Sequence, residues 1–162
     1  NSSNLALLYQ LKLGTKEKVD FEIIESLHHL PHFQTELSAE NTPDIILAFR
    51  NKIKNADAVI FCTPEYIFSI PSGLKNALEW CVSTTVLSRK PVGIITASAN
   101  GIKGHEELQL ILSTLEAIFD SRNTLLIQGV KGKINTEGMI TDEKLLISIN
   151  QFFDSLSSRF FN

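Results

Sequence analysis

The sequence predicts a single α/β domain in which helices cover both faces of a parallel β-sheet. Short runs rich in β-branched residues alternate with longer segments of helical period along the chain. One of these runs, Ala58–Cys62 (AVIFC), is apolar at every position, as expected for a parallel strand that is covered on both faces. Such alternation predicts right-handed βαβ units, because parallel strands need a crossover connection.

The first part of the chain predicts two helices and one strand. Residues Asn4–Leu13 are apolar almost all round and stop at a glycine, as in a buried helix. Val19–Glu25 alternates between apolar and polar residues and is predicted to be a strand. After the polar loop Leu27–Asn41, a Thr-Pro pair starts a helix over Thr42–Asn55.

The second part continues the alternation of strands and helices. Pro71 opens a helix whose apolar positions share one face, and Pro91–Ala97 is the next predicted strand. The segment after the loop Ser98–Gly104 follows the helical period closely as far as Phe119. Thr124–Gln128 is predicted to be a further strand, and a last helix follows it.

The composition fits one domain that spans residues 1–162. The chain is 43% hydrophobic and 20% charged, a balance typical of globular proteins. Its net charge is −3 and its lysines and arginines are scattered along the sequence, which argues against a nucleic acid or an anionic membrane as partner. No apolar run reaches the roughly 20 residues of a membrane helix and no signal peptide is visible, so we expect a cytoplasmic protein.

Neither the cysteines nor the histidines form a recognisable reactive cluster. Cys62 and Cys81 lie in apolar surroundings, which favours two reduced core thiols over a disulfide or a catalytic thiol. Three loosely spaced histidines (His28, His29 and His32) lack cysteine or carboxylate partners, which favours a solvated loop over a metal site. We therefore predict no bound metal.

Three segments are candidates for a ligand site by their position. Ligands of open α/β sheets bind outside the carboxyl ends of the strands. The start of the first helix, the loop after Cys62 and the loop after Ala97 all belong to that edge. At the first of these, Ser2 and Asn4 supply a hydroxyl and an amide where a helix N-terminus attracts phosphate. Ordinary N-capping is the alternative for these two residues.

The loop after Cys62 carries a long ordered string of residues. It reads Pro-Glu-Tyr from Pro64, Ser-Ile-Pro-Ser-Gly from Ser69 and Leu-Lys-Asn-Ala-Leu-Glu-Trp from Leu74. In this string the chain resembles the NADPH-dependent FMN reductase family, which includes azoreductase-like, quinone and chromate reductases. The string is too long to arise readily by chance, so the resemblance is specific.

Other parts of the chain extend this resemblance to nearly all of it except the C-terminal segment. Asp20–Phe33 is similar to the family's second strand and the loop that follows it. Lys90–Val92 and Ala97–Gly104 are similar to its fourth strand and flavin-facing loop. Ser2–Asn4 matches the tail of the family's opening Gly-Ser-x-Arg-x-x-Ser-x-Asn motif.

The resemblance implies a flavodoxin-like three-layer sandwich with a parallel sheet of strand order 2-1-3-4-5. Strand 1, which is missing from this sequence, would lie between Val19–Glu25 and Ala58–Cys62. Without it these two segments would stand about 9–10 Å apart, which is twice the normal strand spacing. We expect roughly ten to fifteen further residues upstream that carry this strand and the rest of the phosphate loop.

The resemblance also implies non-covalent FMN, with NADPH or NADH as co-substrate. Hydride would pass through FMN to a quinone, an azo compound, a metal ion or a flavin in a ping-pong cycle that needs no catalytic residue from the protein. A homodimer or homotetramer is implied as well. The residues carried over as cofactor-binding are Ser2 and Asn4 at the phosphate, the backbone of Pro64, Glu65, Tyr66 and Ile67 beside the isoalloxazine, and Ser98 with Gly101 on its other side.

Several interpretations of the site stay open. The asparagine that usually follows Pro-Glu-Tyr in this family is Ile67 here, which removes an amide from the expected flavin edge. Glu65 is a general base or, as we favour, a residue with a structural hydrogen bond. Phe68 and Trp80 belong to a subunit interface or to the core, and we favour the interface for Phe68.

The alternative function is a flavodoxin-like electron carrier or a degenerate binding module without flavin. A carrier usually has a strongly acidic surface, and a net charge of −3 is mild for that role. The substitution at Ile67 is the feature that keeps the degenerate module open.

Overall fold

Three parallel strands form the sheet of this computed structural model, which describes residues 2–15 and 19–159. The strands are β1 (Val59–Thr63), β2 (Val92–Ser98) and β3 (Thr124–Gln128), in the order β1-β2-β3. All positions of β2 except Ser98 are buried, because this strand is central and is covered on both faces. The predicted parallel sheet is confirmed.

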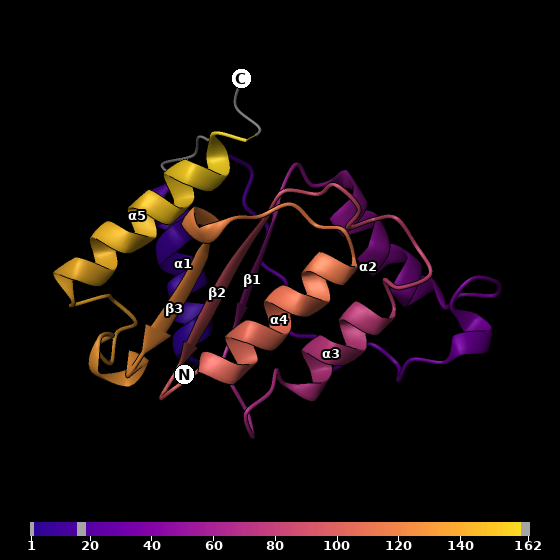
Figure 1. The fold of residues 1–162 in the computed structure, drawn as a ribbon, viewed down its shortest axis with the longest axis horizontal. Coiled ribbons are helices and arrows are strands. Elements are labelled where there is room, and N and C mark those ends of the chain that lie inside the picture. Colours follow the sequence, from indigo (N-terminus) through magenta and orange to yellow (C-terminus); the bar gives the residue numbers. More distant parts are fainter. Residues whose placement is uncertain (1, 16–18, 160–162) are drawn as a thin grey trace.

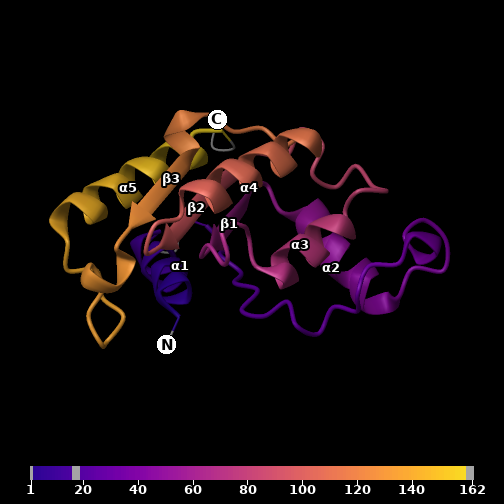
Figure 2. The same ribbon diagram turned by 60° about the horizontal axis from the view of Figure 1, so that its bottom comes forward.

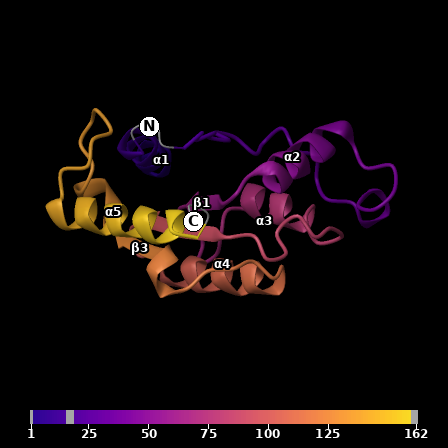
Figure 3. The same cartoon turned by 90° about the horizontal axis from the view of Figure 1, so that it is seen from above.

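Helices cover the two faces of the sheet in separate layers, as Figure 3 shows from above. The helices α1 (Ser3–Gly14) and α5 (Glu143–Ser157) lie on one face. On the other face lie α3 (Ser72–Glu79) and α4 (Ile102–Thr114), and the sheet is visible between α1 and α4 in Figure 2. The remaining helical segments are α2 (Asp44–Asn55) and the short 3₁₀ turns Thr35–Leu37, Ser121–Asn123 and Val130–Gly132.

Alternate residues along the strands divide the core into two clusters. Ile95, Ala97 and Ile127 point towards α1 and α5, where they pack against residues such as Leu7 and Phe152. Strand residues of the opposite parity pack against α3 and α4, together with Ile53 of α2. This division follows from the period of two along a strand and places both layers as the alternating sequence predicts.

The predicted strand Val19–Glu25 is wrong, because this segment is irregular in the structure. Its sequence alternation does correspond to alternating exposure, since Val19, Phe21 and Ile23 are half-buried and the residues between them are exposed. A strand also needs a backbone partner, and within the described residues the sheet ends at β1. The pattern therefore predicted half-burial correctly and hydrogen bonding incorrectly.

The other predicted elements are found with small changes at their ends. The period that predicted a helix as far as Phe119 is broken earlier, since α4 ends at Thr114 and Glu116 has a φ of 61°. Asp142 caps α5 by accepting a hydrogen bond from the N–H of Leu145. In the part of the chain that is described, no helix has both the length and the apolar character needed to cross a membrane.

Candidate functional site

The start of α1 and the ends of β1 and β2 meet at the carboxyl edge of the sheet, near the arrowheads in Figure 1. Asn4, on the first turn of α1, donates from Nδ2 to the carbonyl oxygen of Ala97 at 3.0 Å. The Cys62 thiol donates to the carbonyl oxygen and to Oδ1 of Asn4, both at 3.4 Å. These contacts fix the N-terminus of α1 at the edge where the sequence predicted a ligand site.

Ser2 and Asn4 have different environments at this helix start. Ser2 is the N-cap of α1, and its Oγ accepts a hydrogen bond from the N–H of Leu5 at 3.4 Å. Asn4 is 8% exposed, and its amide is engaged with the protein. What α1 presents to a ligand is therefore the exposed Ser2 together with those N–H groups of its first turn that Ser2 does not cap.

Glu65 joins the loop after β1 to the start of α4. Its Oε1 accepts from the N–H of Gly101 at 3.2 Å, and its Oε2 accepts from the N–H of Gly104 at 2.8 Å. Gly101 is the N-cap of α4 and has no side chain with which to cap the helix. The carboxylate of Glu65 replaces that cap and lies favourably at the positive end of the helix dipole. This geometry favours the structural interpretation of Glu65 over that of a general base.

Residues 66–69 form a tight turn that projects beyond Glu65. The N–H of Tyr66 donates to the carbonyl oxygen of Ser69 at 2.9 Å, and the N–H of Ser69 donates back to Tyr66 at 3.0 Å. The two central residues, Ile67 and Phe68, have φ angles of 50° and 59°, a left-handed conformation that glycine and, less readily, asparagine adopt but that is unfavourable for isoleucine and phenylalanine. Their side chains are 95% and 73% exposed.

A second carboxylate, that of Glu107 on α4, holds the far side of this turn. Its Oε2 accepts from the Ser69 hydroxyl at 2.6 Å and from the N–H of Ile70 at 3.1 Å. Glu107 could not be predicted from the sequence, because a glutamate on an amphipathic helix carries no local signal. Gly104 was a usable hint, since a glycine inside a helix indicates a close approach. A Cβ at that position would lie 3.2 Å from the carbonyl oxygen of Ser69.

A mostly apolar hollow of about 370 Å³ opens between this turn and the beginning of α4. Phe68 and Ile102, both exposed, contribute its apolar surface. Asn100 and Lys103 also line it, and Lys103 forms an exposed ion pair with Glu106 at 2.7 Å. The hollow therefore offers apolar surface beside polar groups at the same edge of the sheet.

Two residues of the Leu-Lys-Asn-Ala-Leu-Glu-Trp string hold the Pro31–Phe33 segment. Asn76 accepts from the N–H of Phe33 at 2.8 Å and donates to the carbonyl oxygen of Pro31 at 3.0 Å. The indole N–H of Trp80 donates to the same carbonyl oxygen at 2.8 Å. Trp80 is fully buried and therefore belongs to the core. The guanidinium group of Arg50 donates from Nε to the carbonyl oxygen of Trp80 at 2.7 Å.

Burial shifts the pKa values of Cys62, Cys81 and His105. It raises the pKa of the Cys62 thiol, and it raises the pKa of Cys81 to about 11, so both free thiols are held in the unreactive protonated form. Burial lowers the pKa of His105, whose Nδ1 lies 2.8 Å from Thr96 Oγ1. The described residues contain no group of three or more histidines, cysteines or carboxylates placed to hold a metal ion.

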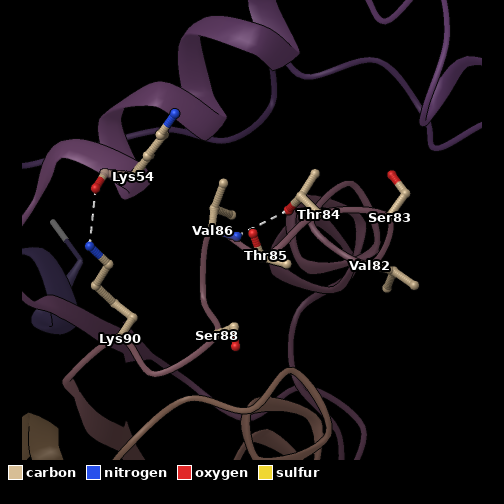
Figure 4. A pocket seen from close by; sticks show the side chains of 8 residues that line it. All are labelled: Lys54, Val82, Ser83, Thr84, Thr85, Val86, Ser88 and Lys90. Carbon is tan, nitrogen blue, oxygen red and sulfur yellow. Dashed lines mark hydrogen bonds between the residues drawn. The ribbon is translucent and has the colours of Figure 1, made fainter.

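A larger hollow, of about 800 Å³, lies at the opposite, amino-terminal edge of the sheet (Figure 4). It is lined by Lys54, Lys90, the hydroxyl-rich segment 82–86 and Ser88. Lys90 donates to the carbonyl oxygen of Lys54 at 3.1 Å, and the Thr84 hydroxyl donates to the carbonyl oxygen of Cys81 at 2.8 Å. Because this hollow lies away from the carboxyl ends of the strands, where ligands of open α/β sheets bind, it is the weaker candidate in spite of its size.

Comparison with known proteins identifies relatives over most of the chain. The family model for NADPH-dependent FMN reductase matches residues 1–131. The chain is 31% identical over 158 residues to the NADH:(hydroxy)cinnamate reductase subunit CrdA of Vibrio ruber, covering 94% of this chain and 77% of that protein. It is 33% identical over 152 residues to an NADPH:quinone oxidoreductase of Arabidopsis thaliana, covering 89% and 78%.

A solved structure gives the same result for the fold. FerB, a flavoenzyme NAD(P)H:(acceptor) oxidoreductase from Paracoccus denitrificans, superimposes with a TM-score of 0.80 at 25% identity. The superposition covers 96% of this chain and 86% of FerB. Together with the three parallel strands, this similarity confirms a flavodoxin-like α/β fold.

Proposed function

The chain belongs to the NADPH-dependent FMN reductase family, and from that premise we propose that it binds FMN at the carboxyl edge of its sheet and reduces small-molecule acceptors with NADPH or NADH. The observation that carries the proposal is the convergence at this edge of a helix N-terminus with the loops that follow β1 and β2. The hydrogen bond from Gly101 to Glu65 connects the two loops, and the hydrogen bond from Asn4 to Ala97 connects α1 to the end of β2.

The residues at this edge fit the parts of FMN. Ser2 and the N–H groups of the first turn of α1, that of Asn4 included, would hold the phosphate. The backbone of Pro64, Glu65, Tyr66 and Ile67 would border the isoalloxazine ring, with Ser98 and Gly101 on its other side. A buried Asn4 side chain is compatible with this proposal, because its hydrogen bond to Ala97 keeps the start of α1 beside the end of β2.

The protein's own residues act by binding and orientation. FMN, when bound, would supply the hydride and electron-transfer chemistry between NAD(P)H and the acceptor in a ping-pong cycle. Glu65 contributes through its two backbone hydrogen bonds, which set the distance between the two loops. No acid, base or nucleophile from the chain is required for this role.

The acceptor we propose is a quinone, an azo compound, a metal ion or a flavin. The quinone is supported by the activity named for the Arabidopsis relative, whereas the name of FerB does not specify the acceptor. The hollow beside Phe68 and Ile102 is apolar and adjoins the proposed ring site, which suits an uncharged planar ring.

We propose further that residues 1–162 act as one domain and that an upstream strand pairs with β1. Val19–Glu25, which is irregular in the described chain, would gain a backbone partner in that strand and complete the order 2-1-3-4-5. The edge of β1 away from β2 supports this, because in the described residues that edge has no strand beside it. We also propose a homodimer or homotetramer. The exposed Tyr66, Ile67 and Phe68 support it, since three neighbouring exposed apolar side chains are typical of an interface.

The proposal is tested with the full-length protein under anaerobic conditions. We expect a yellow preparation, or one that turns yellow with added FMN, which loses its visible absorbance when NADPH or NADH is added. A colourless protein that cannot be reconstituted with FMN would reject the function.

A charge variant tests the phosphate site. Ser2→Asp keeps a good N-cap but places a negative charge at the phosphate, and we expect FMN affinity to fall about tenfold or more. The matched control is Thr85→Asp in the hollow at the opposite edge, which should bind FMN as the wild type does. Equal affinities for the two variants would place the phosphate elsewhere.

A further inference from the structure

The turn at residues 66–69 is held against α4 by one carboxylate on each side. Glu65, which precedes the turn, binds the N–H groups of Gly101 and Gly104. Glu107, which comes from α4 itself, binds the Ser69 hydroxyl and the N–H of Ile70 after the turn. One carboxylate therefore extends from the loop to N–H groups at the start of α4, and the other extends from α4 to donors in the loop.

The turn needs such support because its conformation is unfavourable. Ile67 and Phe68 both have left-handed φ angles, and neither is a glycine or an asparagine. Their side chains are exposed and provide little packing to hold the backbone. Strained conformations persist where the surrounding structure imposes them, and they concentrate at functional sites. The left-handed conformation of this turn is held by the paired backbone hydrogen bonds between Tyr66 and Ser69 and by the hydrogen bonds of Glu107.

Glu107 differs from its neighbour Glu106 in burial and in hydrogen-bond partners. Glu106 is exposed and pairs with Lys103 on the helix surface. Glu107 is half-buried, and in the described chain its carboxylate is in no salt bridge. Its charge is instead stabilised by the hydroxyl and N–H donors of Ser69 and Ile70, and hydrogen bonds to a charged group are among the stronger ones.

We propose that Glu107 is a positioning residue for the reductase site, which holds the 64–67 backbone at the distance from Ser98–Gly101 that the flavin ring requires. This inference rests on the proposed FMN function. The path from Glu107 to the ring site is short, since Ser69 pairs with Tyr66, and Tyr66 belongs to the backbone assigned to the ring edge. Loss of Glu107 would release the turn from α4 on the side that Glu65 does not hold.

The experiment compares Glu107→Ala, Glu107→Gln and the matched control Glu106→Ala in the full-length protein. Amide hydrogen exchange without FMN reports the turn directly. We expect exchange at Tyr66, Ser69 and Ile70 to rise about tenfold or more in Glu107→Ala, as expected for losing hydrogen bonds to a charged group. Glu106→Ala should leave it unchanged, and Glu107→Gln should restore most of the protection, because the amide oxygen can accept the same two bonds.

FMN titration then reports the role in the site. Glu107→Ala should bind FMN about tenfold more weakly and shift the visible absorption band, while Glu107→Gln and Glu106→Ala should resemble the wild type. Unchanged exchange in Glu107→Ala would overturn the inference whether or not FMN binds. Faster exchange with unchanged FMN affinity and spectrum would also overturn it. A wild type that does not bind FMN would reject the proposed function, and that result is distinct from either of these.

Discussion

The carboxylate of Glu65 accepts a hydrogen bond from the N–H of Gly104 at 2.8 Å, across 39 residues of sequence. Gly104 lies in the first turn of α4, whose N-cap is a glycine that cannot cap the helix itself. One side chain thus caps a helix and fixes the loop after β1, so the stability of α4 and the geometry of the candidate site depend on the same contact.

Gly104→Ala is expected to destabilise the protein by about 1 kcal/mol, although alanine is the better helix former. The new Cβ would lie 3.2 Å from the Ser69 carbonyl oxygen and 3.3 Å from the Glu65 side chain. Gly73→Ala is the control, because this helical glycine has open space around it and the substitution should leave stability equal or higher. Urea unfolding measures both. Equal stability of the two variants would contradict the close approach.

Ile67→Asn is expected to stabilise the protein by about 1 kcal/mol, because asparagine tolerates the left-handed conformation that a β-branched residue resists. The Ile67 side chain is 95% exposed, so little packing is lost. Val82→Asn is the control at an exposed position without a positive φ, and it should change stability by less than about 0.5 kcal/mol. A midpoint of urea unfolding for Ile67→Asn at or below that of the wild type would argue against strain in the turn.

His105 should make the protein less stable as the pH falls through the mildly acidic range. Burial holds its pKa in the folded state below the ordinary value, with Glu106 opposing this shift in part. The contribution of neutral His105 to the free energy of unfolding is therefore fully present above about pH 6.5, and it is lost as the pH falls through the pKa of the folded state. Between pH 7.5 and 5 the melting temperature of wild type should fall more than that of His105→Gln, which keeps a neutral partner for Thr96. Parallel profiles would show that His105 is not responsible.

Asn76→Ala should cost about 2 kcal/mol, since it removes both hydrogen bonds to the Pro31–Phe33 segment. Amide exchange at Phe33 should rise at the same time. The control, Asn51→Ala, changes an exposed asparagine on α2 and should be neutral or slightly stabilising. If Phe33 exchanged at the wild-type rate in Asn76→Ala, the segment would be held by other contacts.

The elements that sequence predicted well are those with a local signal. The strand Ala58–Cys62 is an uninterrupted apolar run, and α4 repeats apolar residues at helical spacing, so each pattern determines its own element. Val19–Glu25 has a genuine alternation but no partner strand in the described chain, and pairing is a property of two segments.

The sequence predicted which segments meet at the carboxyl edge of the sheet, but not the contacts that hold them there. Family motifs and the rule for strand ends located the segments that begin at Ser2, Pro64 and Ser98. They did not reveal Glu107, which acts on residues 37 and 38 positions away in the sequence. Nor did they predict the left-handed φ of Ile67, because nothing in a β-branched residue suggests that conformation.

The central claim is that FMN binds at the carboxyl edge of the sheet, and amide chemical shifts during FMN titration of the full-length protein test it most directly. We predict shifts at the first turn of α1, at Glu65–Ile67 and at Ser98–Gly101, with little change at Val82–Ser88. Shifts concentrated at Val82–Ser88, or none at saturating FMN, would contradict the account.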